Sequence, residues 1–431
     1  MRYIFTIFIC ILISGCASKK LDYEIKDVEF YTPQWYKDFN QTMLNNLIDM
    51  ALKNNEDIGV AALNLEIAMI NAGIASDKFI PSMSGEIGAN SSRDISKSDE
   101  FSSSFNSKFS LSYELDIFGK IYDSYKSKEW LWSASRSTLE NLRLTIINQV
   151  ANGYFNILYL NDSLRSLEAN LNNAKMLDNI VTLKYKNGKE ELLAIKQSEQ
   201  NILKLQNQIY STKRSLELSY ESLKNLTRSE VRFDELSLSG VEFVGINEFD
   251  ISELSNRPDI SEAVAKLNSS FYEYRLSQKD LLPSLSLGAS LSDSDKEFKN
   301  SFNFNQLGGI LSFSLPFLDY FKLQKHIKVS ELEFNKLRLN YEKTLKNAIN
   351  EALKYINFYQ NDKITYDNLA IMMENQDKIV NIYKNKYQEG SVELKDLLEA
   401  QNNLISAQIS LLNQKFELLN DELGYYKAVA K

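Results

Sequence analysis

The chain has 431 residues, of which only 5 are proline and 15 are glycine, whereas average usage gives about 50 of the two together. So few breakers predict long uninterrupted elements, which disfavours a many-stranded sandwich, a glycine-rich nucleotide-binding enzyme and a disulfide scaffold. The formal net charge of −8 argues against nucleic acid as a partner, because phosphate binding needs a basic surface. A single histidine and two cysteines leave little material for chemistry, so we expect no catalytic residue, metal site or cofactor.

The first residues in the chain are typical of an export signal. Residues 1–15 contain an apolar run at 3–13, which is too short to span a bilayer, since that takes about 20 residues. The Ser-Gly pair before Cys16 resembles the bacterial lipobox, in which the cysteine receives lipid, including palmitate, and becomes the mature N-terminus. We therefore predict lipidation at Cys16 and a lipidated linker at 16–41, while an ordinary secretory signal remains the alternative.

No other stretch is expected to form a transmembrane helix, so that any part of the mature chain within the membrane would consist of β-strands. Ala17, which follows the cysteine, resembles the lipoprotein form that is sent to the outer membrane.

The chain repeats itself with an offset of 202 residues. Pro81 and Pro283 stand in similar Pro-Ser-x-Ser contexts, and Gly188 and Gly390 end similar Tyr-x-x-Gly motifs, each pair 202 apart. Such coincidence of rare residues predicts two copies of one unit. The predicted ranges are a first repeat at 42–227, a connector at 228–256, a second repeat at 257–427 and a C-terminal tail at 428–431.

Each repeat is expected to contain one helix, two strands and two long helices. Neither proline nor glycine occurs between Phe317 and Glu389, and about 60 helical residues extend on the order of 90 Å. The helix after each Tyr-x-x-Gly motif has Leu or Ile at every seventh position, which predicts coiled-coil packing. These positions are Ile195, Ile202, Ile209, Leu216 and Leu223 in the first repeat, and Leu397, Leu404, Leu411 and Leu418 in the second.

Four segments alternate between apolar and polar residues, which is typical of transmembrane β-strands. They lie at about 82–90, 105–116, 284–292 and 302–315, separated within each repeat by polar loops at 90–104 and 293–301. A half-buried soluble sheet is the alternative. In a membrane the sheet must close, and the smallest closed barrels have about eight strands. Since one chain offers four, we predict a homo-oligomer that shares its barrel and continues it as an α-helical tube.

The chain resembles the TolC-like outer-membrane efflux proteins, in particular their lipid-anchored drug-efflux branch. The resemblance rests on the lipobox, Arg-Pro-Asp-Ile at 257–260, Leu-Asp-Ile-Phe-Gly-Lys at 115–120, Leu-Pro-Ser-Leu at 282–285 and the repeated Tyr-x-x-Gly. It implies a mostly α fold with a small β part, internally duplicated, and a homotrimer with a twelve-stranded β-barrel and a twelve-helix tunnel. It also implies a place in the bacterial outer membrane, in contact with its lipid, and docking to a periplasmic adaptor and an inner-membrane transporter. Within Asn55-Glu56-Asp57-Ile58 the chain departs from the family, because proline is absent there.

The resemblance also implies two kinds of functional residue. The adaptor is expected to dock at the hairpin tips, and plain turns without a partner are the alternative. The tip residues are Tyr185, Gly188, Tyr387 and Gly390.

Six and nine positions after the second tip glycine, Asp396 and Glu399 are expected to line a pore gate as two rings of three carboxylates. A solvated acidic face is the alternative. The first repeat has Ala194 and Gln197 at these positions, so only one of the two hairpins carries the charge.

We therefore expect a passive exit duct that conducts drugs or other small molecules from the periplasm, or from an inner-membrane pump, to the outside. An exit duct for type I protein secretion is one alternative, and a structural coiled-coil lipoprotein of the envelope is a second, of a different class. The four alternating strands favour a duct, because a bracing coiled coil has no use for them. An enzyme is the least favoured class.

Overall fold

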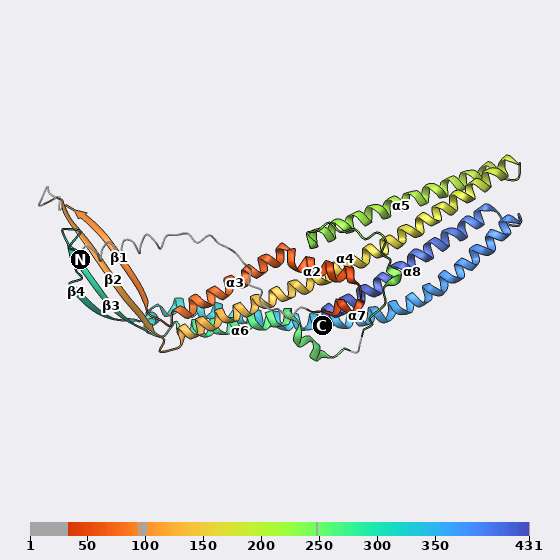
Figure 1. The fold of residues 1–431 in the computed structure, drawn as a ribbon. Coiled ribbons are helices and arrows are strands. Elements are labelled where there is room, and N and C mark those ends of the chain that lie inside the picture. The colour runs from red at the N-terminus through yellow and green to blue at the C-terminus, as the bar shows by residue number, and fades with distance from the viewer. Residues whose placement is uncertain (1–32, 94–95, 97–100, 247–248, 431) are drawn as a thin grey trace. The chain divides into compact units, whose positions relative to one another are not determined.

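A computed structural model describes residues 33–93, 96, 101–246 and 249–430 (Figure 1). The predicted leader and lipidation site at Cys16 lie outside the described residues. In the first repeat the structure has two helices before the strands, where we had expected one. The elements are η1 (Trp35–Phe39), α2 (Thr42–Asn54), α3 (Glu56–Asp77), β1 (Ser82–Ser92), β2 (Ser102–Leu115), α4 (Lys120–Lys186) and α5 (Leu192–Thr227).

The break between α2 and α3 lies at Asn55, which has an extended backbone with φ −74° and ψ 123°. Its side-chain oxygen accepts hydrogen bonds from the backbone N–H groups of Asp57 at 3.0 Å and Ile58 at 3.4 Å. Asn55 is thus an N-cap that starts α3, at the position where the second repeat uses Arg257 and Pro258.

The second repeat follows the order that the first repeat has from α3 onward. Its elements, with the short helices of the connector before them, are η2 (Leu238–Gly240), η3 (Ile251–Asn256), α6 (Pro258–Lys279), β3 (Ser284–Asp295), β4 (Gln306–Ser314), η4 (Pro316–Asp319), α7 (Tyr320–Gln388) and α8 (Leu394–Val429).

The strand bounds differ from those we predicted from alternation. β1, β2 and β3 extend further into the expected loops, because backbone pairing continues through serines, as in the pair Ser92 and Ser102. The fourth strand begins at Gln306 and not at 302, since Phe304 has φ 50°, which a strand does not allow. The loop between β3 and β4 is therefore 296–305 and not 293–301.

The four strands form one antiparallel sheet in the order β1-β2-β3-β4. Residues directly opposite each other share a face, so the register assigns each side chain to one of two faces. One face, which we call the apolar face, carries Met83, Ile87, Phe109, Leu111, Tyr113, Leu285, Leu287, Leu291, Leu311 and Phe313. The opposite face, the serine face, carries Ser84, Ser110, Ser112, Ser286, Ser290 and Ser312.

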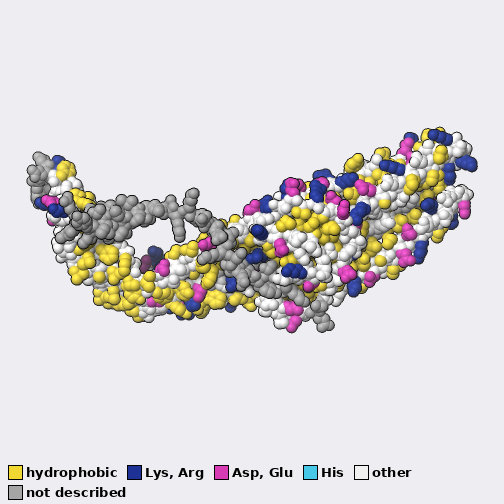
Figure 2. Space-filling model, viewed as in Figure 1, with side chains coloured by type: hydrophobic (Ala, Val, Ile, Leu, Met, Phe, Trp, Pro, Cys, Tyr) yellow, Lys and Arg dark blue, Asp and Glu magenta, His cyan; other side chains and the backbone are white. Residues whose placement is uncertain are grey.

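Many side chains of the apolar face are exposed, for example Met83 at 70% and Phe313 at 65%. Figure 2 shows hydrophobic side chains gathered on the part of the molecule that holds the sheet, while charged side chains are spread over the helices. Within the described part of the chain, β1 and β4 each have a hydrogen-bonded neighbour on one side only. The sheet therefore has two open edges.

The largest hydrophobic core lies where α2, α4, α5, α8 and the connector meet. Ile147, Phe155 and Leu238 are fully buried there, and Trp35 stacks on Tyr426 with ring centroids 5.7 Å apart. Each such side chain contributes on the order of 2 kcal/mol through removal of its surface from water. This core fixes the middle of the helical part, from which the two hairpins α4–α5 and α7–α8 extend (Figure 1).

Two helices carry apolar surface that the chain itself does not cover. Along α7 only Ala348, Ala352 and Tyr387 are buried, and many large apolar side chains on this helix are exposed. By length and composition alone, α3 could cross a membrane. The expectation that no other stretch could form a transmembrane helix was therefore wrong in these two respects.

Candidate functional site at the hairpin tips

The two hairpin tips share one backbone design. Gly188 and Gly390 have φ of 71° and 77°, in the left-handed region that only glycine adopts at no steric cost. The N–H of Gly188 donates to the carbonyl of Tyr185 at 2.9 Å, and the N–H of Gly390 donates to that of Tyr387 at 3.2 Å. These bonds satisfy the last carbonyls of α4 and α7. The glycine at each hairpin tip thus has a structural reason in both repeats.

The two tip tyrosines, however, have different environments. Tyr185 is 41% exposed, whereas Tyr387 is 3% exposed. Tyr387 lies in a small core that joins both hairpins and includes Val181, Ala194 and Leu397. In this conformation Tyr387 offers no surface to a partner, so the expectation that it contacts an adaptor does not fit its burial.

Tyr387 instead connects the α7–α8 hairpin to the α4–α5 hairpin. Its hydroxyl donates a hydrogen bond to Oε1 of Glu190 at 2.8 Å. Nζ of Lys184 donates to the carbonyl of Tyr387 at 3.2 Å and lies 3.7 Å from the centroid of its ring. We call Lys184, Glu190 and Tyr387 the tip clasp.

The tip clasp is partly shielded from water, since the side chains of Lys184 and Glu190 are 26% and 20% exposed and their charged atoms lie 4.0 Å apart. Burial, and then the hydrogen bond to Glu190, raise the pKa of the Tyr387 hydroxyl. The hydroxyl therefore stays protonated and remains a donor at all physiological pH values. The sequence contained no signal for this contact beyond the repeated tyrosine.

The two predicted gate carboxylates lie at the start of α8. Asp396 is half-buried, and its Oδ2 accepts a hydrogen bond from the N–H of Glu393 at 3.3 Å, as part of a capping box. Glu399 is exposed one turn further along. Asp396 thus also stabilises the N-terminus of α8, a role that the sequence analysis did not assign to it.

The structure explains why the first repeat has no charge at the first of these two positions. Ala194, the counterpart of Asp396, is 7% exposed and belongs to the core that surrounds Tyr387. A carboxylate at this place would lose its hydration without gaining a partner, which is unfavourable. The first hairpin therefore has alanine where the second has aspartate, because this position of the first hairpin lies in the core at the tip.

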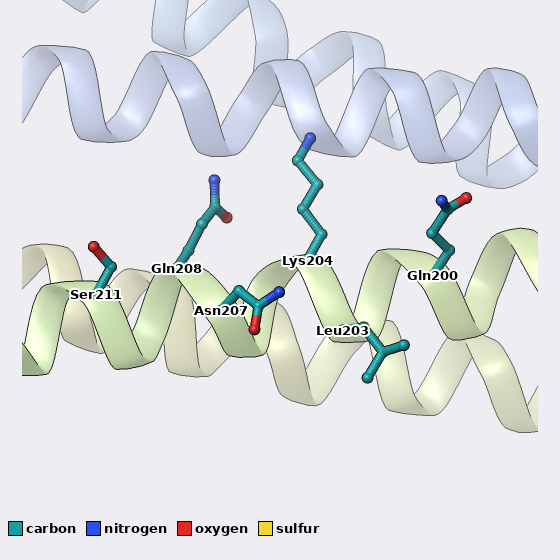
Figure 3. Close-up of a pocket in the computed structure, with 6 residues that line it drawn as sticks. All are labelled: Gln200, Leu203, Lys204, Asn207, Gln208 and Ser211. Carbon is teal, nitrogen blue, oxygen red and sulfur yellow. The ribbon is translucent and has the colours of Figure 1, made fainter.

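Between the tips and the middle of the helical part, a groove of about 450 Å³ lies along α5. It is lined by Gln200, Leu203, Lys204, Asn207, Gln208 and Ser211. In Figure 3, Gln200, Lys204 and Gln208 point from α5 toward the facing helix, while Leu203 points away from it. These polar side chains lie beside an apolar cluster in which Leu205 and Ile209 of α5 join Ile405 of α8. Among the described residues, no group of three or more His, Cys, Asp or Glu side chains is placed to hold a metal ion.

Further toward the centre, α8 holds the connector with a buried carboxylate that the sequence analysis missed. Glu422 is fully buried and accepts hydrogen bonds from the N–H groups of Val244 at 3.1 Å and Gly245 at 2.8 Å. The hydroxyl of Tyr426 donates to the carbonyl of Gly245 at 2.8 Å. These contacts attach the connector between the repeats to the helix that also carries the candidate gate.

Comparison with known proteins agrees with this architecture. Residues 47–227 and 252–430 match the model of the outer membrane efflux protein family. Because the match covers most of the chain, the protein belongs to this family, and the resemblance inferred from its motifs is confirmed. The fold class, mostly helical with a small antiparallel sheet, is confirmed as well.

Three similar proteins show the range of the family. Toxin and drug export protein A of Aggregatibacter actinomycetemcomitans is 28% identical over 414 residues, which cover 92% of this chain and 90% of that protein. The pyoverdine export outer membrane protein OpmQ of Pseudomonas aeruginosa is 25% identical over 416 residues, covering 92% and 86%. The crystal structure of the Campylobacter jejuni CmeC outer membrane channel superimposes with a TM-score of 0.84 at 25% identity, covering 95% and 90%.

These relatives are export proteins and channels and not enzymes. The family assigns the chain to the outer membrane and to efflux, which disfavours the alternative of a coiled-coil lipoprotein that only braces the envelope.

Proposed function

We propose that the protein is the exit duct of a tripartite efflux system. Three copies would combine their sheets into a twelve-stranded barrel in the outer membrane and their long helices into a twelve-helix tunnel through the periplasm. The observation that carries this proposal is the four-stranded sheet with one apolar face, one serine face and two open edges. In lipid an open edge leaves backbone groups unpaired at a cost of several kcal/mol each, and pairing β1 with β4 of the next copy removes both edges.

The uncovered apolar surface of the helices supports the same assembly. On α7 the exposed fractions of Val329, Leu332 and Ile371 are 58%, 56% and 59%. A neighbouring copy packed against α3 and α7 would bury such side chains, which is the largest favourable contribution to most protein association. The homotrimer thus accounts for the sheet edges and the helix surfaces together.

The cargo and the partners follow from the position of such a duct. Drugs or other small molecules would enter from the periplasm or from an inner-membrane transporter, with a periplasmic adaptor docked at the hairpin tips. Tyr185 and Gly188 are exposed there, which supports them as docking residues. Type I protein secretion remains the second candidate, because the relative from Aggregatibacter is named for the export of both a toxin and drugs.

In the trimer, Asp396 and Glu399 would form two rings of three carboxylates at the inner end of the tunnel. Like charges at close range repel one another and attract cations, so the closed end should be cation-selective. The tip clasp would hold this end closed, because the α7–α8 hairpin cannot move outward unless Tyr387 leaves Glu190. The serine face of the sheet would line the barrel, and lipid on Cys16 would anchor the chain to the membrane.

The test is the oligomeric state and location of the full-length protein, together with drug susceptibility. We expect trimers that dissociate on heating before electrophoresis, in the outer-membrane fraction, and a deletion strain that is more sensitive to drugs. Substituting Cys16 with Ala should abolish incorporation of labelled palmitate while trimers still form. A monomer in the soluble fraction would overturn the duct, whereas unchanged drug susceptibility would shift the cargo to the protein-secretion alternative.

A further inference from the structure

The β3–β4 loop, residues 296–305, has a well-defined set of internal contacts. Oδ1 of Asp295 accepts a hydrogen bond from the N–H of Glu297 at 2.8 Å. The hydroxyl of Ser301 donates to the carbonyl of Phe298 at 2.8 Å, and Ser301 is fully buried. The side-chain amide of Asn305 donates to Asp293 at 3.4 Å, across the base of the loop. These bonds give the loop one preferred conformation.

The loop folds back over the apolar face of the sheet. The hydroxyl of Ser107 donates to the carbonyl of Ser301, and the ring of Phe298 lies 5.6 Å from that of Phe105 in an edge-to-face contact. Phe105 and Ser107 occupy alternate positions on β2, on the same face as Phe109 and Leu111. The loop therefore covers the end of the apolar face and not the serine face.

At this end the apolar face would otherwise be polar. The register pairs Ser107 with Asp293 and Phe105 with Asp295, so two carboxylates and a hydroxyl lie in the last rows of the face. Beneath the loop, Ser107 and Asp293 are only 2% and 9% exposed. The surface that the loop presents in their place includes Phe298, which is 46% exposed. A polar end of the face is thus replaced by an aromatic one.

The position of these rows matches the edge of a bilayer. From Leu115 to Phe105 a strand rises about 34 Å. With the tilt of about 40° that strands have in membrane barrels, this corresponds to about 26 Å along the membrane normal, and the apolar band of such barrels is about 25 Å tall. The loop therefore lies at the boundary between acyl chains and headgroups, where membrane barrels place their aromatic girdles.

We propose that the β3–β4 loop is a lipid-binding element, which seats Phe298 and Phe304 at the headgroup–acyl boundary of the outer leaflet. This inference rests on the proposed function, because it requires the apolar face to be in contact with lipid. Phe304 contributes a second exposed ring, 40% exposed, from a backbone with φ 50° that phenylalanine seldom adopts. Lys296 and Lys299 are exposed on the same loop, so ammonium groups lie within reach of headgroup phosphates.

The experiment uses a fluorescent label at a single cysteine of the purified trimer. The sequence has two cysteines, of which Cys10 lies in the predicted leader and Cys16 carries lipid in the proposal, so the unsubstituted protein reports the background. Phe298→Cys is labelled with an environment-sensitive dye and placed in phosphatidylcholine vesicles. Quenching is then compared between nitroxide lipids, at shallow and deep acyl positions, and aqueous iodide.

Two control positions follow from the register. Ser294 lies opposite Asn106, on the serine face, and Ser294→Cys should be quenched by iodide and not by lipid. Leu311 lies opposite Leu287, within the apolar face and one row from its Leu115 end, and Leu311→Cys should be quenched by nitroxide lipid and not by iodide. We expect Phe298→Cys to be quenched several-fold more by shallow nitroxide than Ser294→Cys is, and several-fold less by iodide.

Each other outcome has a definite meaning. If Leu311→Cys is quenched by lipid while Phe298→Cys behaves like Ser294→Cys, the loop lies in water and the inference is wrong, although the barrel stands. A label at 298 that neither quencher reaches is buried against protein, which also overturns the inference. If lipid fails to quench Leu311→Cys, the proposed function itself fails. Should Phe298→Cys not yield heat-modifiable trimers, Phe304→Cys supplies the same measurement.

Discussion

The hydroxyl of Tyr387 donates a hydrogen bond to Oε1 of Glu190 at 2.8 Å, and this contact joins two helical hairpins that lie about two hundred residues apart in sequence. The counterpart of Tyr387 in the first repeat, Tyr185, is exposed. Two positions that are equivalent in the duplicated sequence have thus acquired different roles, one inside the molecule and one on its surface.

Replacing Tyr387 with Phe removes only the hydroxyl of the tip clasp, and we expect the channel to open more readily. A hydrogen bond to a charged group contributes about 1.5–3 kcal/mol, and each 1.4 kcal/mol is a factor of 10. The open population should therefore rise about 10-fold or more, measured as conductance in planar bilayers. Tyr185→Phe is the matched control and should leave the conductance unchanged. Equal behaviour of the two variants would remove the tip clasp from the gate.

Neutralising the two predicted gate carboxylates should weaken the block of the channel by multivalent cations and reduce its selectivity for cations. Because Asp396 also caps α8, Asp396→Asn with Glu399→Gln is the more informative variant, since amides keep the shape and the ability to accept a hydrogen bond. Replacing both with Ala should in addition raise the ion leak, because the capping box is lost. Bilayer recordings in which the double amide variant keeps its block and selectivity would contradict the assignment.

The sequence was sufficient to predict the fold class and most helices and strands of one chain, and for a physical reason. Duplication, period-two strands and seven-residue repeats are local patterns, and local patterns determine which elements form. The seam predicted at Ile209, Leu216 and Leu223 is indeed buried between the helices. Strand ends were predicted less well, because pairing between serines such as Ser92 and Ser102 leaves no hydrophobic signal.

The contacts between hairpins could not be predicted in the same way. Whether Tyr387 faces the solvent or the other hairpin depends on how the two coiled coils lie against each other, which no local pattern encodes. The same holds for Glu422, whose partners are backbone N–H groups of the connector and are therefore the same for any sequence. The start of α3 is a different case, because here the sequence departs from the family pattern and the fold does not. The proline of that pattern is absent, and the side chain of Asn55 caps the helix instead.

The stability of the helical part should fall as the pH rises toward 7, because of Asp421. Burial, together with the neighbouring Asp362 and Glu417 and against the effect of Lys354, raises the pKa of Asp421 to about 7, whereas an unfolded chain has about 3.9. Between about pH 4 and about pH 7 the folded state binds more protons than the unfolded state. The contribution of Asp421 to the free energy of unfolding is therefore fully present below about pH 4 and is lost by about pH 7.

Asp421→Asn should therefore raise the melting temperature at pH 8 and leave it nearly unchanged at pH 4. The effect is at most about 1.4 kcal/mol per pH unit between these limits. Thermal unfolding of the purified protein, followed by circular dichroism, measures it. Glu221→Gln, at an exposed position on α5, is the control and should shift the melting temperature little at either pH. A stabilisation by Asp421→Asn that is the same at both pH values would disprove titration as its cause.

At Gly424 the ring of Tyr355 on α7 packs directly against the backbone of α8. A methyl group at this residue of α8 would overlap the ring of Tyr355 on α7. Gly424→Ala should therefore destabilise the α7–α8 pair by about 1–3 kcal/mol, although alanine is the better helix former. Gly153→Ala on α4 is the control, because the nearest atom to its added carbon, Cδ1 of Leu223, lies at an ordinary contact distance of 3.8 Å, and there the gain in helix propensity of up to about 1 kcal/mol should prevail. Denaturant titrations of the two variants should move in opposite directions, and a Gly424→Ala variant as stable as Gly153→Ala would mean that the two helices separate at no cost.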